Sequence, residues 1–475
     1  MCAVVGVYGT LEAAKCVRRA LSAALQHRGQ ESAGIAVSDG TDIRVKTVLG
    51  YVKNLTDETL LELLGYMAIG HTRYSTAGKS RIQEAQPLWT DCLHGQVTVV
   101  HNGNFVDQRR ERSLMMQLGS KFDTTSDTEL FLHLYCRSNR SKLKDRLIEV
   151  GKRLQTAFAL IVMTQDKLVA MRDPWGFRPL MVGKVGGTTV IASEDCAFRQ
   201  LQMMTGSRVS ELRDVEPGEM IIVDDDGVHS DIVFHADHRL QCVFEHVYFS
   251  RPDSKTFGLH VEQVRRNLGR SLASVRKIEA DIVVPIPNSG IHAGIGYSEA
   301  SGIPIEWALV RNQYVGRTFI APIQSDRENS VEEKLLPIVH LMRGRRVILV
   351  DDSIVRGTTM HKIVSMVRNI GEAKEVHVVI SCPPSISPCF YGVDTPRRKE
   401  LLAVSHADEI CEVIQADTLT YNTLPNLLAA VAPHQDLFCT SCYTNKHPVL
   451  EMLGLNQDGL PERRRTVIPL KPSQG

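Results

Sequence analysis

The chain has 475 residues, of which 43% are apolar and 23% are charged, and its 55 basic side chains nearly balance its 54 acidic ones. These values are typical of a soluble globular protein and exclude a strongly charged surface that would attract nucleic acid or a membrane. At ~150 residues per domain, the length predicts about two or three domains.

The chain carries no apolar run of the ~18 residues that a membrane span needs. Its first residues lack the charged and apolar pattern of a secretion signal. We therefore expect a cytoplasmic protein that binds neither membrane nor nucleic acid. In a reducing compartment, its 11 cysteines predict metal ligands or catalytic thiols rather than a disulfide framework.

The chain changes its pattern near residue 236. Residues 2–235 contain short apolar runs broken by glycine, among them AVVGVYG and QVTVVHNGNF, which predict strands of a layered β-rich domain with a few helices. In residues 236–455 longer helical patterns alternate with strands, which predicts a parallel sheet with helices on both faces. The long polar segment 311–345 predicts a lid, and residues 456–475 predict an exposed tail.

The run RRVILVDDSIVRGTTM, residues 345–360, predicts a phosphate site. Its VILV part is typical of a strand buried on both faces, and Asp351 and Asp352 follow at the carboxyl end, where open α/β sheets bind ligands. A helix cap would account for DDS alone. The whole run, with its glycine, hydroxyls and helix start, predicts that the phosphate is held by Ser353, Arg356, Gly357, Thr358 and Thr359.

This run resembles the signature of type I phosphoribosyltransferases. The resemblance implies that Asp351 and Asp352 hold the ribose hydroxyls and influence a bound magnesium ion. In DIVVPIPNSG, residues 281–290, Asn288 stands where that family usually has an aspartate, and we expect the lost charge to weaken the magnesium site without abolishing it. The resemblance implies one Mg²⁺ per subunit, at Ser289, Asp351 and Asp352.

Cys2 becomes an N-terminal thiol if Met1 is removed. Its α-amino group, with a reference pKa of about 7.7 to 8, is suited to act as the base for that thiol. Arg73, in HTRYST, offers a bidentate fork for a carboxylate. Asn102 and Gly103, in VVHNGNF, offer an amide donor and a backbone N–H for an oxyanion.

Two further motifs complete this pattern. SDTEL supplies Asp127 for a substrate ammonium, and HRGQESAG supplies Arg28. Taken singly, such residues are most often surface groups or turns. Together with Cys2 they resemble the class II glutamine amidotransferases, which are N-terminal-nucleophile (Ntn) hydrolases with a layered αββα fold. The resemblance implies Cys2 as nucleophile, Asn102 and Gly103 as the oxyanion hole, and glutamine binding by Arg28, Arg73 and Asp127.

Cys439 and Cys442 have CxxC spacing, which by itself fits half of a zinc site, a redox pair or neither, with zinc as the first expectation. Cys242, in QCVFEHVYFSRPDS, and Cys389, in SISPCFYGVDTP, lie in segments that resemble the cluster-bearing branch of the amidophosphoribosyltransferase family. Cys382 is an alternative to Cys389. The resemblance implies one 4Fe-4S cluster per subunit, with a structural role, held by Cys242, Cys389, Cys439 and Cys442.

The resemblance to this family covers roughly residues 2–450. It implies a two-domain α/β and α+β fold, with an Ntn glutaminase domain at 2–235 and a type I phosphoribosyltransferase domain at 236–455. It implies that glutamine, 5-phosphoribosyl 1-pyrophosphate and water give 5-phosphoribosylamine, pyrophosphate and glutamate, the first step of de novo purine biosynthesis. It further implies a homotetramer that purine nucleotides inhibit.

Two other classes of protein remain open. Another class II glutamine amidotransferase, such as a glucosamine-phosphate synthase or an asparagine synthetase, would share the first half but would need other motifs in place of VDDSIVRGTT. A non-catalytic regulator that senses nucleotides on a phosphoribosyltransferase fold would have no need of Cys2, Arg73, Asn102 and Asp127 together.

Overall fold

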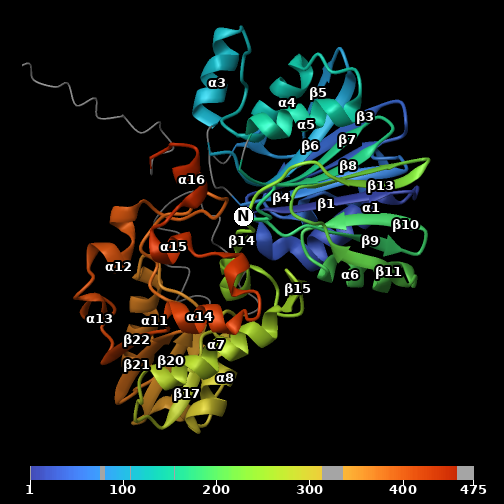
Figure 1. The fold of residues 1–475 in the computed structure, drawn as a ribbon. Coiled ribbons are helices and arrows are strands. Elements are labelled where there is room, and N and C mark those ends of the chain that lie inside the picture. The colour runs from blue at the N-terminus through green and yellow to red at the C-terminus, as the bar shows by residue number, and fades with distance from the viewer. Residues whose placement is uncertain (1, 75–80, 107, 155, 313–334, 457–475) are drawn as a thin grey trace, which may run out of the picture.

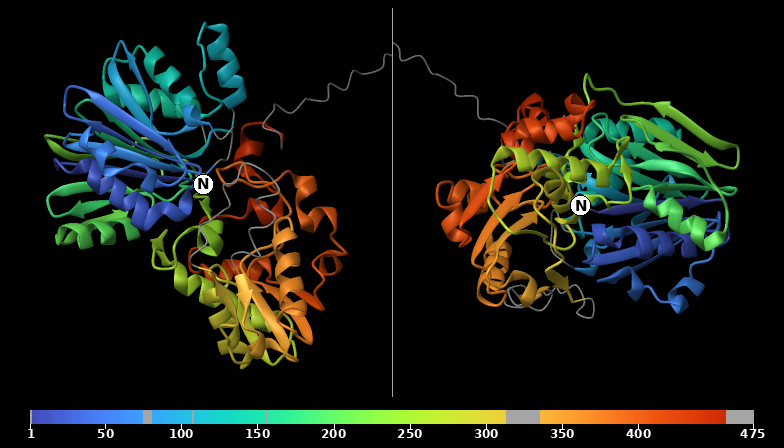
Figure 2. Two further views of the ribbon diagram at one scale, coloured as in Figure 1. Left: turned by 180° about the vertical axis from the view of Figure 1, so that it is seen from behind. Right: turned by 90° about the horizontal axis from the view of Figure 1, so that it is seen from below.

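The structure is a computed structural model that describes residues 2–74, 81–106, 108–154, 156–312 and 335–456. Met1, most of the predicted lid (313–334) and the predicted tail from 457 onward lie outside the described residues. The described chain forms two bodies, with the N-terminus between them (Figure 1). Views from behind and from below show the same arrangement (Figure 2).

Two antiparallel sheets build the first body. The first sheet has the order β11 (Val209–Asp214), β9 (Met181–Val185), β10 (Thr188–Ala192), β1 (Ala3–Tyr8), β4 (Met67–Arg73), β2 (Ser32–Ser38) and β3 (Ile43–Leu49). The second sheet has the order β13 (Gly227–Ile232), β12 (Glu219–Asp224), β8 (Leu168–Arg172), β7 (Ala157–Thr164), β6 (Gly95–Asn104) and β5 (Leu88–Cys92).

These sheets pack face to face, and helices cover their outer faces. Val4 and Ile69 of the first sheet share a core with Ile161 and Ala170 of the second, because alternate side chains of each strand point to this core. The outer face of the first sheet is covered by α1 (Ala13–Arg19), η1 (Ala20–Leu25) and α6 (Cys196–Thr205). The outer face of the second is covered by α4 (Thr128–Arg137) and α5 (Leu143–Leu154). The result is an αββα sandwich.

A parallel sheet forms the centre of the second body. Its order is β17 (Ile282–Pro285), β20 (Arg346–Asp351), β21 (Glu375–Ile380) and β22 (Thr418–Tyr421). In β20, Val347 and Leu349 pack into one core while Ile348 and Val350 pack into another. Burial on both faces therefore accounts for the uninterrupted apolar run VILV.

Helices cover both faces of this sheet. The longer ones are α7 (Val261–Val275), α8 (Ile291–Ser301), α11 (Thr358–Asn369) and α14 (Leu424–Ala430). Tyr297 of α8 packs on the face that carries Ile348, and Ile363 of α11 packs on the face that carries Leu349. Shorter helices of the second body are α10 (Val339–Met342), α12 (Leu402–Ser405), α13 (Ile410–Val413), α15 (Ser441–Thr444) and α16 (Pro448–Met452). Two further helices, α2 (Asp57–Leu61) and α3 (Gln108–Gln117), pack on the first body.

Among the described residues, three small strand pairs lie outside these sheets. They are β14 (Gln241–Cys242) with β23 (Phe438–Cys439), β15 (Lys255–Thr256) with β16 (Leu259–His260), and β18 (Leu309–Arg311) with β19 (Leu335–Pro337).

A shared core joins the two bodies. Trp175 and Phe177 of the first body pack with Tyr391 and Leu450 of the second. The expected two-domain α/β and α+β fold, with an Ntn-type sandwich followed by a parallel sheet, is confirmed. The second sandwich sheet ends at Ile232, before β14 begins, and the exact boundary at 235 stays a prediction. Among the described residues, no helix is long and apolar enough to cross a membrane.

The contact between α7 and α8 depends on glycine. A Cβ on Gly269 of α7 would lie 1.9 Å from the backbone oxygen of Ala293 in α8. We expect Gly269→Ala to lower the free energy of unfolding by roughly 1–3 kcal/mol, because the helices must separate, although alanine favours helix formation. Urea unfolding followed by circular dichroism measures this. Ser274→Ala, on the exposed side of α7, is the control, and equal midpoints for the two variants would contradict the packing.

Candidate active sites

Cys2 lies at the start of β1, the central strand of the first sandwich sheet, between β10 and β4. Its side chain is buried. Its backbone N–H donates to Asn102 Oδ1 at 3.1 Å, and its Sγ lies 3.6 Å from the carbonyl oxygen of Tyr74. The hydrogen bond to Asn102 links the two sandwich sheets at this thiol.

Asn102 and Gly103 lie at the end of β6, beside Cys2. The Asn102 side chain is fully buried, and its Nδ2 has no hydrogen-bond partner among the described residues. Gly103 has φ +154°, and a Cβ there would lie 2.0 Å from the carbonyl oxygen of Ala157, so only glycine fits. A buried amide donor without a partner suits an oxyanion that a substrate brings.

Asp127 is buried before α4. Its Oδ2 accepts from the Phe105 N–H at 3.0 Å and lies 3.6 Å from His101 Nδ1. Burial alone would raise the pKa of Asp127, but the His101 imidazole and these hydrogen bonds bring it below its ordinary value. The carboxylate is therefore ionised at neutral pH, as an ammonium partner must be.

Arg73 ends β4, next to the start of β1. Thr72 is the register partner of Ala3, so Arg73 lies beside Cys2 across the strand pair. Its guanidinium is buried, and Nη1 lies 3.5 Å from Glu31 Oε2. The structure thus places Cys2, Asn102, Gly103 and Arg73 around one point.

Arg28 lies next to Cys2, in a fully buried position. Its fully buried guanidinium donates from Nε to the Cys2 carbonyl oxygen at 3.1 Å, from Nη1 to Glu194 at 2.6 Å, and from Nη2 to Glu245 at 2.7 Å. These partners engage all three nitrogens. Through its Nε, Arg28 therefore holds the backbone of Cys2. Glutamine binding by Arg28 stays an untested prediction.

The carboxylates around Arg28 are held ionised. Burial alone would raise the pKa of Glu194, but His27 and Arg28 hold it well below its ordinary value. The pKa of Glu245 is lowered in the same way, against burial, by Arg28 and Arg178. Arg28 therefore lies in a buried network of complementary charges, which is the condition under which charges can be buried.

The second site lies at the carboxyl end of β20, as the sequence predicted for Asp351 and Asp352. Ser289 Oγ donates to Asp351 Oδ1 at 2.7 Å, and the Asp352 N–H donates to the same oxygen at 2.9 Å. Ser353 Oγ donates to Asp352 Oδ2. Burial and the neighbouring Asp352 raise the pKa of Asp351 well above its ordinary value, and burial raises the pKa of Asp352. A bound cation would relieve this crowding of carboxylates.

The predicted phosphate loop leads from Asp352 into α11. Gly357, with φ +80°, is the residue before the helix, and Thr358 and Thr359 form its exposed first turn. The Arg356 side chain is mostly exposed, with Nη2 3.6 Å from Glu400 Oε2. An exposed helix start with two hydroxyls is suited to an anion.

Across the sheet edge, the turn 287–290 runs from β17 into α8. Asn288 is exposed there, and Ser289 reaches Asp351. The turn therefore joins the paired acids, as expected for Ser289. The donors are oxygens, which magnesium prefers, so these residues fit the ion.

The predicted thiol ligands gather at the contact between the two bodies. Cys242 and Cys439 are register partners in the β14–β23 pair, and Cys389 packs beside Cys242. Burial and the neighbouring Cys242 raise the pKa of Cys439 to about 12. Burial and the other cysteines raise the pKa of Cys442 well above its ordinary value.

These thiols have the chemistry of a metal centre but not its closed geometry. In the described part of the chain, no group of three or more His, Cys, Asp or Glu side chains is placed to hold a metal ion. Buried thiols that raise one another's pKa would be stabilised as thiolates by a cation. The donor set fits a thiolate-bound centre, and the choice between iron–sulfur and zinc stays open.

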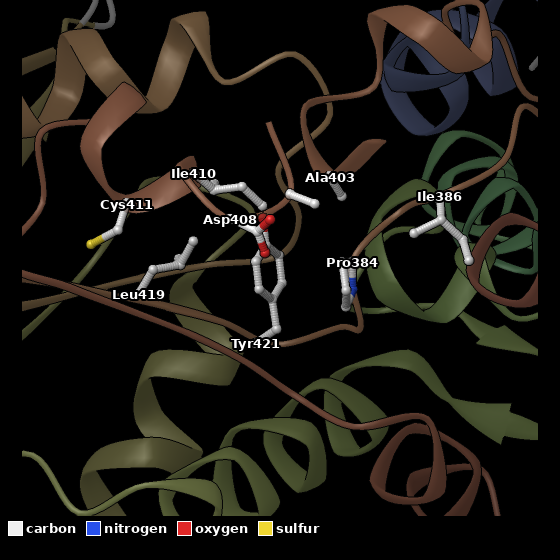
Figure 3. A pocket seen from close by; sticks show the side chains of 9 residues that line it. Pro384, Ile386, Ala403, Asp408, Ile410, Cys411, Leu419 and Tyr421 are labelled. Carbon is white, nitrogen blue, oxygen red and sulfur yellow. The ribbon is translucent and has the colours of Figure 1, made fainter. Parts of the chain in front are cut away.

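A cavity of about 400 Å³ lies at the same edge of the parallel sheet (Figure 3). Tyr421, the last residue of β22, and Asp408 project into it, among otherwise mostly apolar residues. Ala403 of its wall follows Leu402, whose N–H donates to the Val355 carbonyl of the phosphate loop. None of the predicted ribose, phosphate or magnesium residues lines this cavity.

Sequence reasoning missed several residues that shape the first site. The carbonyl of Tyr74 receives the Cys2 thiol, His101 faces Asp127, and Glu194 and Glu245 neutralise Arg28. No local signal marks the two glutamates, because their partner is 166 and 217 residues away. A buried arginine does imply such partners.

Comparisons with known proteins agree with this geometry. A family model described as a glutamine amidotransferase domain matches residues 71–200. Amidophosphoribosyltransferase of Bacillus subtilis is 42% identical over 454 residues, covering 94% of each chain. That of Methanocaldococcus jannaschii is 41% identical, covering 94% of this chain and 98% of its own. The chloroplastic enzyme of Glycine max is 43% identical, and the match covers 94% of this chain and 78% of that enzyme.

Solved structures extend the agreement to three dimensions. Glutamine phosphoribosylpyrophosphate amidotransferase from B. subtilis, complexed with ADP and GMP, superposes with a TM-score of 0.86 at 42% identity, over 94% of this chain and 97% of that one. A structure described as the allosteric regulatory enzyme of purine biosynthesis also superposes with a TM-score of 0.86 at 42% identity. The match covers 94% of this chain and 96% of that one. The chain therefore belongs to the amidophosphoribosyltransferase family and is a transferase with a glutamine amidotransferase domain.

Proposed function

We propose that this chain hydrolyses glutamine at Cys2 and transfers the ammonia to 5-phosphoribosyl 1-pyrophosphate, giving 5-phosphoribosylamine, pyrophosphate and glutamate. The observation that carries the proposal is the buried Asn102 Nδ2, which has no hydrogen-bond partner among the described residues. The Oδ1 of the same side chain accepts a hydrogen bond from the Cys2 N–H. A regulator without catalysis has no use for such a donor. A buried polar atom of this kind costs about 1–3 kcal/mol, which substrate binding recovers.

In the first half-reaction, Cys2 Sγ attacks the side-chain amide carbon of glutamine. The α-amino group of Cys2, once Met1 is removed, takes the thiol proton and passes it to the leaving ammonia. Asn102 Nδ2 and the Gly103 N–H stabilise the oxyanion. Water then hydrolyses the glutamyl thioester. Arg73 binds the substrate carboxylate and Asp127 its ammonium, in keeping with the ionised state of Asp127.

In the second half-reaction, ammonia displaces pyrophosphate at C1 of the ribose. Asp351 and Asp352 bind the ribose hydroxyls, and the loop of Ser353, Arg356, Gly357, Thr358 and Thr359 binds the 5-phosphate. A magnesium ion beside Ser289, Asp351 and Asp352 would neutralise charge on the pyrophosphate. Because both acid side chains are buried, their positions are restricted, and the ribose hydroxyls that they bind are oriented for in-line displacement.

Ammonia must pass between the sites without loss to water. Free ammonia is mostly protonated at neutral pH and is then no nucleophile, so a dry route is needed. We propose the segment 311–345 as the lid that completes this route. Its central residues, 313–334, lie outside the described residues.

We further propose that Cys242, Cys389, Cys439 and Cys442 hold one 4Fe-4S cluster with a structural role. Support comes from their gathering at the contact between the two bodies, where Cys242 is buried and the other three are partly buried. Purine nucleotides are proposed as feedback inhibitors, since a solved relative is complexed with ADP and GMP. A homotetramer stays a prediction.

Cys2→Ala tests the nucleophile. We expect glutamine-dependent release of pyrophosphate from phosphoribosyl pyrophosphate to fall by roughly 10³-fold or more, and ammonia-dependent release to persist, because the second site is intact. A coupled pyrophosphate assay measures both rates. Cys16→Ala, another buried cysteine of the same body, is the control and should retain both activities. Full glutamine-dependent activity in Cys2→Ala would refute the assignment.

Asp352→Asn tests the magnesium site. We expect the Mg²⁺ concentration for half-maximal ammonia-dependent activity to rise by about 10–100-fold, because a charged oxygen near the ion is lost. Asp281→Asn is the matched control, since Asp281 precedes β17 on the surface and pairs with Arg346. Identical magnesium titrations for both variants would argue against the site.

Metal analysis tests the thiol centre. Protein purified without oxygen should be brown and contain about four irons per chain, because four thiolates match a 4Fe-4S cluster. Inductively coupled plasma spectrometry and the visible spectrum measure this. Colourless protein loaded with zinc would replace the iron assignment by a zinc site.

A further inference from the structure

Two segments of the second body carry predicted thiol ligands and also contact the glutaminase site. One is the loop Cys389–Gly392, referred to below as the 389 loop. The other runs from Cys242 in β14 to Glu245 at the start of η5 (Glu245–Phe249). The first contacts Gly103 and Asn104, and the second contacts Arg28.

The 389 loop packs directly on the oxyanion segment. Asn104 Nδ2 donates to the Phe390 carbonyl oxygen at 2.8 Å. Gly392 has φ +106°, and a Cβ there would lie 2.9 Å from the Cα and 3.0 Å from the carbonyl carbon of Gly103. The loop therefore restricts the position of the Gly103 backbone.

The thiol and an aromatic stack hold the 389 loop in place. The Tyr391 N–H donates to Cys389 Sγ at 3.3 Å, and the Cys389 N–H donates to Thr395 Oγ1 at 2.7 Å. The Tyr391 ring stacks on Phe177 of the first body with centroids 4.3 Å apart. Any change at Cys389 Sγ therefore acts on a loop in contact with Gly103.

The second segment reaches Cys2 through one side chain. The Cys242 N–H donates to the Phe177 carbonyl oxygen at 3.2 Å. Three residues later, Glu245 accepts from both terminal nitrogens of Arg28, and Arg28 Nε donates to the Cys2 carbonyl oxygen. The backbone of the nucleophile is thus held by a carboxylate of the second body.

We propose that the 389 loop positions the oxyanion hole and that Glu245, through Arg28, positions Cys2, so that glutamine cleavage depends on the segments that carry the thiol centre. The inference rests on the proposed roles of Cys2, Asn102 and Gly103. Neither Gly392 nor Glu245 touches the reacting atoms in this scheme, so both are positioning residues. A displacement of about 1 Å at a reacting group can cost roughly 10²-fold in rate.

Gly392→Ala tests the 389 loop. We expect the kcat for glutamine to fall by about 10-fold or more, with KM for glutamine changed less than about 2-fold, because Gly103 is displaced while Arg73 and Asp127 are not. Ammonia-dependent activity should not change. Gly227→Ala is the matched control, because Gly227 has a similar φ of +122° and open space around it, and it should alter neither activity.

A labelling experiment separates positioning from general damage. A diazoketone analogue of glutamine needs the oxyanion hole to react with Cys2, whereas iodoacetamide needs only an accessible thiol. In Gly392→Ala, the rate of Cys2 modification, followed by peptide mass spectrometry, should fall about 10-fold for the diazoketone and stay unchanged for iodoacetamide. If Gly392→Ala does not fold, Asn104→Ala, which removes the hydrogen bond to Phe390, replaces it.

Glu245→Gln tests the second segment. We expect the kcat for glutamine to fall by about 10-fold while ammonia-dependent activity persists, because Arg28 loses a charged partner and with it the fixed position of the Cys2 carbonyl. Glu219→Gln is the matched control, since Glu219 is equally buried and is paired with Arg213 through two hydrogen bonds, and it should leave both activities unchanged.

The outcomes separate this inference from the proposed function. If the wild-type protein is not labelled at Cys2 by the diazoketone, the proposed nucleophile is wrong. If the wild type is labelled and Gly392→Ala or its replacement is labelled at the same rate, positioning by the 389 loop is overturned. Equal loss of glutamine- and ammonia-dependent activity in Glu245→Gln would overturn positioning by Glu245.

Discussion

The buried guanidinium of Arg28 is the interaction on which the junction of the two bodies depends. It joins Glu194, which follows β10, to Glu245 of η5, and it holds the carbonyl oxygen of Cys2. Removing one partner of a buried ion pair costs about 3–5 kcal/mol, because a charge is left uncompensated. The network therefore constrains the first body, the second body and the nucleophile at one point.

The two sites use burial in opposite ways. At the first, Asp127 is buried, yet His101 and backbone donors keep it ionised, so the site is prepared for a cationic group before substrate arrives. At the second, Asp351 and Asp352 are buried together and their pKa values are raised, so the site favours a cation that restores both charges. These opposite charge states agree with the proposed roles, amino-acid binding at the first site and binding of a metal with the phosphate substrate at the second.

Much of this organisation could be predicted from the sequence, because it follows from local pattern. The run VILV indicates a strand buried on both faces. Asp351 and Asp352 come directly after this run, which predicts their position at the carboxyl end of the strand. Cys2 with Asn102 and Gly103 indicates a nucleophile and its oxyanion hole. The contacts of Arg28, Glu245 and Gly392 could not be predicted, because they join residues far apart in the chain, and nothing near any of them specifies the partner.

The buried position of Arg28 bears on how the two half-reactions communicate. An arginine in an open pocket would be available to bind substrate. The terminal nitrogens of Arg28 are instead hydrogen-bonded to carboxylates from both bodies. Gly103, the other neighbour of Cys2, is in close contact with Gly392 of the second body. Since both supports of the proposed glutaminase site include residues beyond its own sandwich, the positioning proposal implies that a shift of the second body alters the geometry of cleavage. Ammonia release can thus follow the state of the half that consumes it.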